Sequence, residues 1–265
     1  MKQLLSLAVL ALLCLAGNAQ EYKVSMSNGK ILLHNVNNVT IEGYSGSEVL
    51  ITKMKGDPEC EDKDEDDEEE KDRRKGLREI NAAGKSDNTG IGLNTNKEGS
   101  KLHVEQISKN NSSPYRVQVP AGVAIFYEHS NHSGDEITIK NISSEIEIDA
   151  NYNDISFKNL SGPVALNTVY GDIEGSFEKV SSKSDVSIYS VYGHVDVTIP
   201  ASTKADFRLN APYGQMFTDL DLDVSSKTNT GHSKGSRITG SLNGGGIDFS
   251  IKASYDNIYL RKKKS

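Results

Sequence analysis

A short phrase centred on tyrosine recurs five times in the second half of the chain. Each copy reads small-any-Tyr-(Gly, Asn or Asp)-polar-aliphatic, as in Thr168-Val169-Tyr170-Gly171-Asp172-Ile173. The repeated tyrosines are Tyr152, Tyr170, Tyr192, Tyr213 and Tyr255, separated by 18, 22, 21 and 42 residues. The last step equals two steps of 21, and Gly244-Gly245-Gly246-Ile247 resembles a partial copy within it. A period of about 20 residues is typical of solenoids, in which each repeat forms one coil of a stack.

The segments between these phrases alternate apolar and polar residues, as half-buried β-strands do. Examples are Val164-x-Leu166, Val186-x-Ile188 and Val195-x-Val197-x-Ile199. Glycine tolerates a positive φ, so we expect corners at Gly171, Gly193 and Gly214. We therefore predict an all-β fold, a parallel β-solenoid of roughly 20-residue coils from about Lys101 to Leu260, with irregular strands before it. A β-sandwich is the alternative, because alternation alone does not separate the two architectures.

Negative charge is concentrated in one tract of the chain. Between Asp57 and Lys75 stand twelve acids and five bases, a net charge of −7 that equals the formal charge of the whole chain. Such dense like charge cannot bury apolar area, so we expect a disordered insert over residues 57–90. A calcium loop beginning at Asp62 is the alternative, but Asp67 and Arg73 stand where an EF-hand needs Gly and Glu. The insert separates N-terminal strands at 20–56 from a solenoid domain at 91–265.

Residues 1–19 have the features of a secretory signal peptide. Lys2 supplies a positive charge, Leu4 to Leu15 form an apolar run of 12 residues, and Ala19 ends a small-residue cleavage site. The run is shorter than the ~20 residues of a membrane-spanning helix, so we expect an exported mature chain without an integral membrane span. Lipid attachment at Cys14 is the alternative. After cleavage only Cys60 remains, so no intramolecular disulfide can form.

Four features together resemble the bacterial putative-adhesin family, a group of unknown function with β-solenoid folds. They are the secretion signal, the Tyr-Gly-Asp-Ile type of phrase, the strand end Val119-Pro120-Ala121-Gly122 and the final Ile258-Tyr259-Leu260-Arg261. The resemblance covers the chain from about Val36 to Leu260 and implies an exported β-solenoid. It implies no catalytic residues, since the family supplies none to transfer, and the acidic tract departs from the family pattern.

The direction of the repeated tyrosines is predicted from their parity along the strands. In Leu166-x-Thr168-x-Tyr170 and Leu209-x-Ala211-x-Tyr213, tyrosine shares a face with aliphatic and small residues. We therefore expect the tyrosines to point inward as a structural corner ladder. This ladder comprises Tyr152, Tyr170, Gly171, Tyr192, Gly193, Tyr213, Gly214 and Tyr255. An exposed stripe for stacking against sugars is the alternative.

A second row follows the tyrosines by two residues and consists of Asp154, Asp172, His194, Gln215 and Asn257. Some β-helical polysaccharide enzymes hold an acid, a base or calcium with such groups, which makes Asp154, Asp172 and His194 an alternative catalytic site. Polar residues after a corner more often cap backbone groups. His129-Ser130-Asn131-His132 carries potential metal ligands in no established metal spacing, so we interpret it as a polar turn.

The sequence favours a binding or scaffold function over catalysis. It contains no nucleophile elbow, phosphate loop or CxxC pair, and its net charge of −7 disfavours nucleic acid as a partner. We predict an exported, non-enzymatic, adhesin-like or envelope scaffold protein with an extended binding face and no cofactor. The expected partner is an envelope or extracellular polymer, a glycan or a matrix protein. A small β-helical polysaccharide lyase or hydrolase that uses the stacked aspartates is the alternative.

Overall fold

The computed structural model describes residues 20–55, 72–108, 113–133, 136–181, 184–224 and 236–264. Within these ranges the chain is all-β, as predicted, with sheets of 10 and 11 strands and one helical turn at 72–74. The predicted signal peptide, Cys60 and residues 57–71 of the acidic tract lie outside these ranges. Among the described residues, no helix has the length and apolarity needed to cross a membrane.

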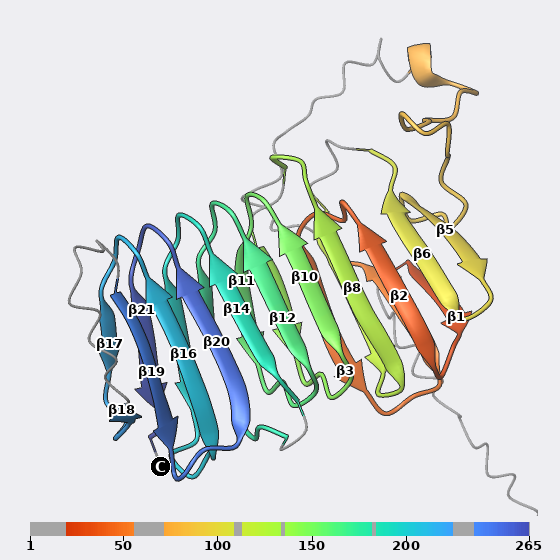
Figure 1. Cartoon of the computed structure of the whole chain (residues 1–265). Coiled ribbons are helices and arrows are strands. Elements are labelled where there is room, and N and C mark those ends of the chain that lie inside the picture. Colours follow the sequence, from red (N-terminus) through yellow and green to blue (C-terminus); the bar gives the residue numbers. More distant parts are fainter. Residues whose placement is uncertain are drawn as a thin grey trace, which may run out of the picture.

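The two sheets, which we name sheet A and sheet B, lie face to face along the molecule, and in Figure 1 sheet B is in front with most of sheet A behind it. In spatial order, sheet A contains β1 (Glu21–Ser25), β4 (Glu48–Lys53), β7 (Tyr115–Pro120), β3 (Val39–Tyr44), β9 (Glu136–Lys140), β11 (Asp154–Lys158), β13 (Ile173–Ser176), β15 (Val195–Ile199), β21 (Ile258–Lys262) and β17 (Met216–Thr218). Sheet B contains β18 (Asp223–Val224), β19 (Ser236–Leu242), β16 (Ala205–Ala211), β20 (Ile247–Ala253), β14 (Val186–Ser190), β12 (Val164–Thr168), β10 (Ile146–Ala150), β8 (Val123–His129), β2 (Gly29–His34), β6 (Lys101–Gln106) and β5 (Leu93–Glu98).

Consecutive strands lie in opposite sheets through the middle of the chain, and we call each such pair a coil. Ile146 pairs with Val164 in sheet B, and Ile155 pairs with Ile173 in sheet A, so both strands of a coil step by the same 18 residues. All pairs between neighbouring coils are parallel. Antiparallel pairing is confined, within the described residues, to β1, β4, β5, β18 and β19 at the two ends, and makes both sheets mixed.

The order of the coils in space differs from their order in the sequence at both ends. β20 pairs with β14 on one side and β16 on the other, so the last coil, β20–β21, lies between β14–β15 and β16–β17. Likewise, the first coil, β2–β3, lies between β6–β7 and β8–β9. The interpretation of the 42-residue step as two coils of 21 is therefore wrong. The chain doubles back through antiparallel β19 and then re-enters the stack as β20.

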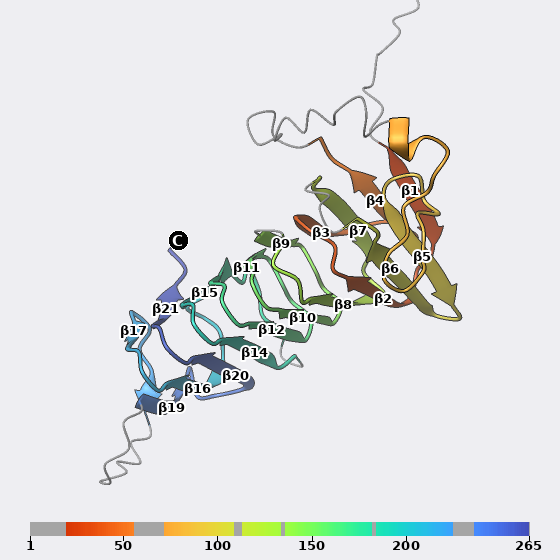
Figure 2. The same ribbon diagram turned by 90° about the horizontal axis from the view of Figure 1, so that it is seen from above.

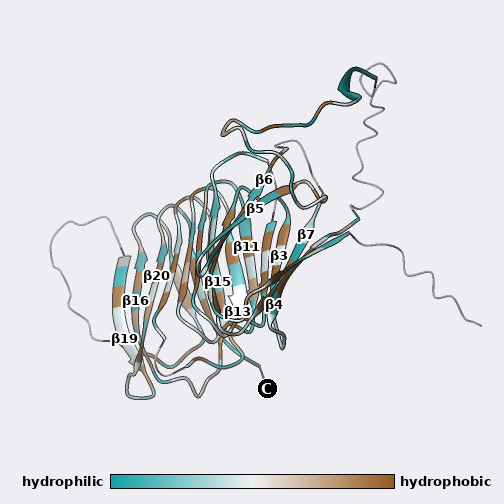
Figure 3. Ribbon diagram, turned by 90° about the vertical axis from the view of Figure 1, so that its right-hand side faces the viewer, coloured by the Kyte–Doolittle hydropathy of each residue, from teal (hydrophilic) through white to brown (hydrophobic). Residues whose placement is uncertain are grey.

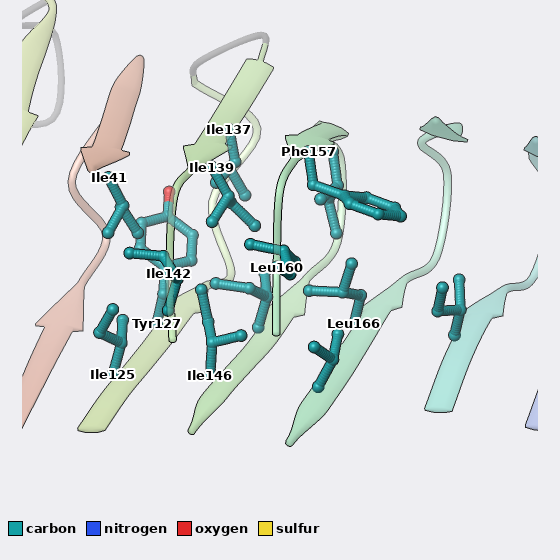
Figure 4. Close-up of a cluster of buried hydrophobic side chains, with 14 of the residues drawn as sticks. Ile41, Ile125, Tyr127, Ile137, Ile139, Ile142, Ile146, Phe157, Leu160 and Leu166 are labelled. Carbon is teal, nitrogen blue, oxygen red and sulfur yellow. The ribbon is translucent and has the colours of Figure 1, made fainter. Parts of the chain in front are cut away.

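The core lies between the two sheets and follows directly from the alternation in sequence. Every second residue of β10, β11 and β12 is buried, and the intervening residues face solvent. Figure 4 shows Ile41, Ile125, Ile139 and Ile146 pointing toward one another from opposite layers. Burial of each such aliphatic side chain stabilises the fold by roughly 1.5–3 kcal/mol. Hydrophobic residues are spread along the strands of both sheets (Figure 3), so the core continues through the stack.

The corner glycines are required for space, and the predicted positive φ is wrong. Gly171, Gly193 and Gly214 are not among the residues with positive φ. A Cβ on Gly171 would lie 1.9 Å from the carbonyl oxygen of Asn153 in the neighbouring coil. The positive φ falls instead at the opposite corner, on Asn141 (58°) and Asn159 (60°), whose side chains hydrogen-bond at 2.9 Å. The tyrosine corners are tight because two coil backbones meet there.

The last part of the predicted disordered insert differs from that expectation. The side chains of Asn81 and Lys85 both bond to Glu105 of β6, at 2.7 and 2.8 Å. Asp87 accepts hydrogen bonds from the backbone N–H groups of Thr89, Gly90 and Gly92. Burial opposes ionisation of the Asp87 carboxyl, but these bonds outweigh it and lower its pKa. Residues 81–90 are thus held against sheet B by polar contacts that hydrophobicity does not reveal.

Substitution of Gly171 by alanine tests the space argument. We expect Gly171→Ala to lower the free energy of unfolding by about 3 kcal/mol, because the new Cβ overlaps a backbone atom that cannot rotate away. Gly76→Ala is the control, because a Cβ at Gly76 would meet open space. Its only expected cost is about 1 kcal/mol of unfolding free energy, since alanine is unfavourable at a φ of 77°. Equal losses in urea unfolding experiments would contradict the close-approach explanation.

Candidate functional site

The five repeated tyrosines form one continuous stack along a corner of the molecule. In spatial order they are Tyr152, Tyr170, Tyr192, Tyr255 and Tyr213, each on the corner that leads from a sheet B strand to a sheet A strand. Neighbouring ring centroids lie 4.9 to 5.1 Å apart, and the planes differ by only 6° to 12°. We call this row the tyrosine ladder. Its spacing is the distance between hydrogen-bonded strands.

The tyrosine ladder faces solvent, so the inward direction predicted for it is wrong. The five residues are between 48% and 69% exposed. Strict alternation ends with the buried small residue that closes each sheet B strand, such as Ala150, Thr168 or Ser190. The backbone then bends over the next three residues and turns the tyrosine outward. The inward–outward alternation of side chains along a strand therefore does not predict the direction of a side chain beyond the corner.

Small hydroxyl residues support the corner from inside. The Thr168 hydroxyl donates to the Asn153 carbonyl at 3.0 Å and lies 3.3 Å from the Gly171 N–H, which donates to it. Ser190 repeats both bonds one coil further, to the Gly171 carbonyl and from the Gly193 N–H. These contacts provide hydrogen-bond partners for buried backbone groups at the corner, where the regular hydrogen bonding between strands is interrupted. They hold the backbone that presents each tyrosine.

Stacking determines which part of each tyrosine remains available to a ligand. The inner rings have a neighbouring ring against both faces, so their faces are covered and their edges point to water. Among the described residues, the five phenol oxygens have no protein hydrogen-bond partner within 3.5 Å. The tyrosine ladder therefore offers a line of hydroxyl groups spaced one strand apart.

The predicted row of Asp154, Asp172 and His194 does come together beside the tyrosine ladder. Asp154 Oδ1 accepts the backbone N–H of Asp172 at 2.8 Å, and Asp172 Oδ1 accepts that of His194 at 2.8 Å. Asn257 Oδ1 accepts the N–H of Gln215 in the same way at 2.9 Å. Each acceptor thus caps a backbone group of the adjacent coil. This arrangement favours the structural interpretation of the row over the catalytic one.

The His194 ring bridges two carboxylates of the neighbouring coil. Its Nδ1 lies 2.9 Å from Asp172 Oδ1, and its Nε2 lies 2.7 Å from Glu174 Oε1. Partial burial opposes protonation of the imidazole. The hydrogen bond to Glu174 and the charges of Asp172, Glu174 and Asp256 outweigh it, so the pKa of His194 is raised above its ordinary value.

A second aromatic group on sheet A was missed in the sequence. Phe217 stacks on Tyr259 at 5.3 Å, and the Arg261 guanidinium lies 5.4 Å from the centre of the Tyr259 ring. Arg261 also pairs with Asp196 through its Nη2 at 2.6 Å. Both aromatic residues stand four positions after a repeated tyrosine. That common offset was the available signal.

The two histidines of the predicted polar turn lie in different environments. His129 is buried, and its Nε2 lies 2.9 Å from the Asn37 side-chain oxygen. Burial lowers the pKa of His129. His132 is exposed on the loop that follows. Across the described parts of the chain, no three His, Cys, Asp or Glu side chains are grouped so as to hold a metal ion.

Comparisons with known proteins give no family. No protein-family model and no curated protein match the chain, including any model of the adhesin family that its motifs resemble. A putative cell adhesion protein from Clostridium sporogenes has 12% identity and a TM-score of 0.44, with 93% of this chain and 100% of that chain covered. A putative adhesin from Bacteroides fragilis has 12% identity and a TM-score of 0.38, with 92% and 98% covered.

The tyrosine ladder itself should contribute to stability. Tyr192 stacks on two rings, whereas Tyr213 stacks on one described ring. We expect Tyr192→Ala to lower the free energy of unfolding by about 1–2 kcal/mol and Tyr213→Ala by about half of that. Tyr192→Phe should be near neutral, because it keeps the ring. Denaturant titration measures all three, and equal losses for the two alanine variants would show that stacking is not the cause.

Stability should depend on pH through His194. Because the pKa of His194 is raised in the folded state, its contribution is complete below the unfolded value of ~6.5 and is lost as the pH rises through the folded pKa. We expect the difference in melting temperature between the wild type and His194→Gln to be larger near pH 6 than near pH 9. A difference that is constant or grows with pH would exclude this role.

Proposed function

We propose that this protein is a non-catalytic β-solenoid that binds an extended extracellular or envelope partner along its tyrosine ladder. The observation that carries this proposal is the continuous exposed stack of five tyrosines over five successive coils. Export, as predicted from residues 1–19, would place this surface outside the cytoplasm.

Parallel pairing between all neighbouring coils supports the solenoid part of the proposal. Eight coils follow one another in both sheets in the same order, and Figure 2 shows them as successive turns around a common core. Antiparallel strands extend three of the four sheet edges: β4 and β1 lie beyond β7, β5 lies beyond β6, and β19 and β18 lie beyond β16. At the fourth edge, β17 is the outermost strand of sheet A, and it is only three residues long, as short edge strands commonly are.

A repeated surface suits a repeated partner. Each phenol hydroxyl can contribute about 0.5–1.5 kcal/mol of net hydrogen-bond energy, which is too little for useful affinity from one contact. Several identical contacts to one polymer act together, because the first contact raises the effective concentration for the next. The tyrosine ladder extends over four strand spacings, or roughly 19 Å, so it can hold several units of one polymer.

A binding screen on the chain from residue 20 onward, against immobilised glycans and matrix proteins, tests the proposal. We expect single changes such as Tyr170→Ala to weaken binding a few-fold, and the triple change at Tyr170, Tyr192 and Tyr255 to abolish it. Phe126→Ala is the matched control, since this aromatic residue lies on the outer face of β8, outside the tyrosine ladder. If the triple variant stays folded by circular dichroism and still binds, the ladder is not the binding surface.

Catalysis by the aspartate row is the second candidate and needs a separate experiment. Asp154 and Asp172 each accept a backbone N–H from the next coil, which favours a structural role. We expect no cleavage of polysaccharides by the wild type, measured as released reducing ends or unsaturated products. Cleavage by the wild type that Asp172→Asn abolishes, while the melting temperature is kept, would establish the lyase or hydrolase instead.

A further inference from the structure

We propose that the partner of the tyrosine ladder is a neutral, unbranched, 1,4-β-linked glycan that lies along the stack with one sugar ring against each coil. This inference rests on the proposed function and adds the chemical class and orientation of the ligand. It uses three properties of the ladder: its pitch, the groups it exposes and the charge beside it.

The pitch of the tyrosine ladder restricts which polymers can stay in register with it. Neighbouring ring centroids are 4.9 to 5.1 Å apart, so a ligand that places one hydroxylated unit against every phenol must advance by about that distance per unit. Side chains on one face of an extended peptide repeat at about 6.7 Å, twice the ~3.3 Å rise per residue, and fall out of step after one coil. Each six-membered ring of a 1,4-β-linked chain advances by nearly one strand spacing of ~4.8 Å. Successive rings are turned over, so opposite edges meet successive phenols, and both edges carry hydroxyl groups that donate and accept hydrogen bonds.

The exposed groups suit a polyhydroxylated ligand. The inner ring faces of the tyrosine ladder are covered by neighbouring rings, so flat stacking of a sugar on the inner tyrosines is excluded. The outward edges carry hydroxyl groups that both donate and accept hydrogen bonds, as sugar hydroxyls do. The exposed side chain of Gln215 lies in the next row and adds an amide group, whereas the Asn257 amide is bonded to the Gln215 N–H and to the Tyr259 hydroxyl.

The charge beside the tyrosine ladder selects against acidic polymers. Asp154 and Asp172 stand in the row next to Tyr152 and Tyr170, and Glu174 lies one position further on the same face. Within the described residues, His194 is the basic group that contacts these carboxylates, and it contacts two of them. A polymer of uronic acids or sulfated sugars would be repelled here. A second copy of this chain has a matching pitch, but it would bring its own acidic row against this one.

The length dependence of oligosaccharide binding tests the register. Isothermal titration calorimetry with 1,4-linked β-glucose oligomers of two to six units should show affinity that rises with each unit up to five and then levels off. The triple change of Tyr170, Tyr192 and Tyr255 to phenylalanine should weaken binding of the five-unit oligomer at least ten-fold, because it removes hydroxyls and keeps the stacked rings. Tyr189→Phe, on the outer face of β14, is the control and should leave binding unchanged.

Each other result overturns the inference in a recognisable way. If affinity does not depend on the length of the oligosaccharide, or is kept in the triple phenylalanine variant, the arrangement of one sugar per coil is wrong. Equal or tighter binding of an acidic glycan of the same length would remove the charge argument. If no oligomer binds, but a partner from the broader screen is lost with the triple alanine variant, the proposed function stands and the glycan assignment fails. A dimer in analytical ultracentrifugation that the triple phenylalanine change dissociates would make a second copy the partner.

Discussion

Parallel backbone pairing in register is the constraint on which the rest of this structure depends. It places each side chain one strand spacing from the side chain at the same position of the next coil. The side chain at each position must therefore pack against the equivalent side chain of the next coil, and in this chain equivalent positions carry side chains of the same type. Aliphatic residues fill the inside, hydroxyls support one corner, and paired asparagines such as Asn141 and Asn159 turn the other.

The same constraint turns a sequence repeat into a surface. Because tyrosine occupies the same corner position in five coils, each tyrosine ring contacts the tyrosine of the neighbouring coil. The distance between the stacked rings equals the strand spacing. A solvent-exposed row of this kind needs support from behind, which Thr168 and Ser190 supply by bonding the corner backbone. Parallel pairing in register thus produces both the repetition of the tyrosines and the fixed backbone that presents them. Both properties suit the proposed contact with a regular polymer.

Sequence alone predicted the features that depend on spacing and alternation. The 18- and 22-residue steps predicted which strands pair, and the alternation predicted the buried rows. The outward direction of Tyr170 could not be derived, because the alternation stops at Thr168 where the backbone bends. The place of the last coil could not be derived either, since a step of 42 residues fits two successive coil lengths of 21 as well as a re-entering coil. The crowding at Gly171 depends on a carbonyl from another coil, which local sequence does not reveal.

The re-entry of the first and last coils has a consequence for how the chain reaches its native state. The strands β2 and β3 pair only with strands that come much later, β6 to β9, so they remain without partners until those segments are available. At the other end, β20 must insert beside β14 and β16 after both exist. Folding therefore cannot proceed by adding one coil after another in sequence order from either terminus. It should begin among β8 to β15, and the two insertions should be the slow steps, because long-range contacts close late.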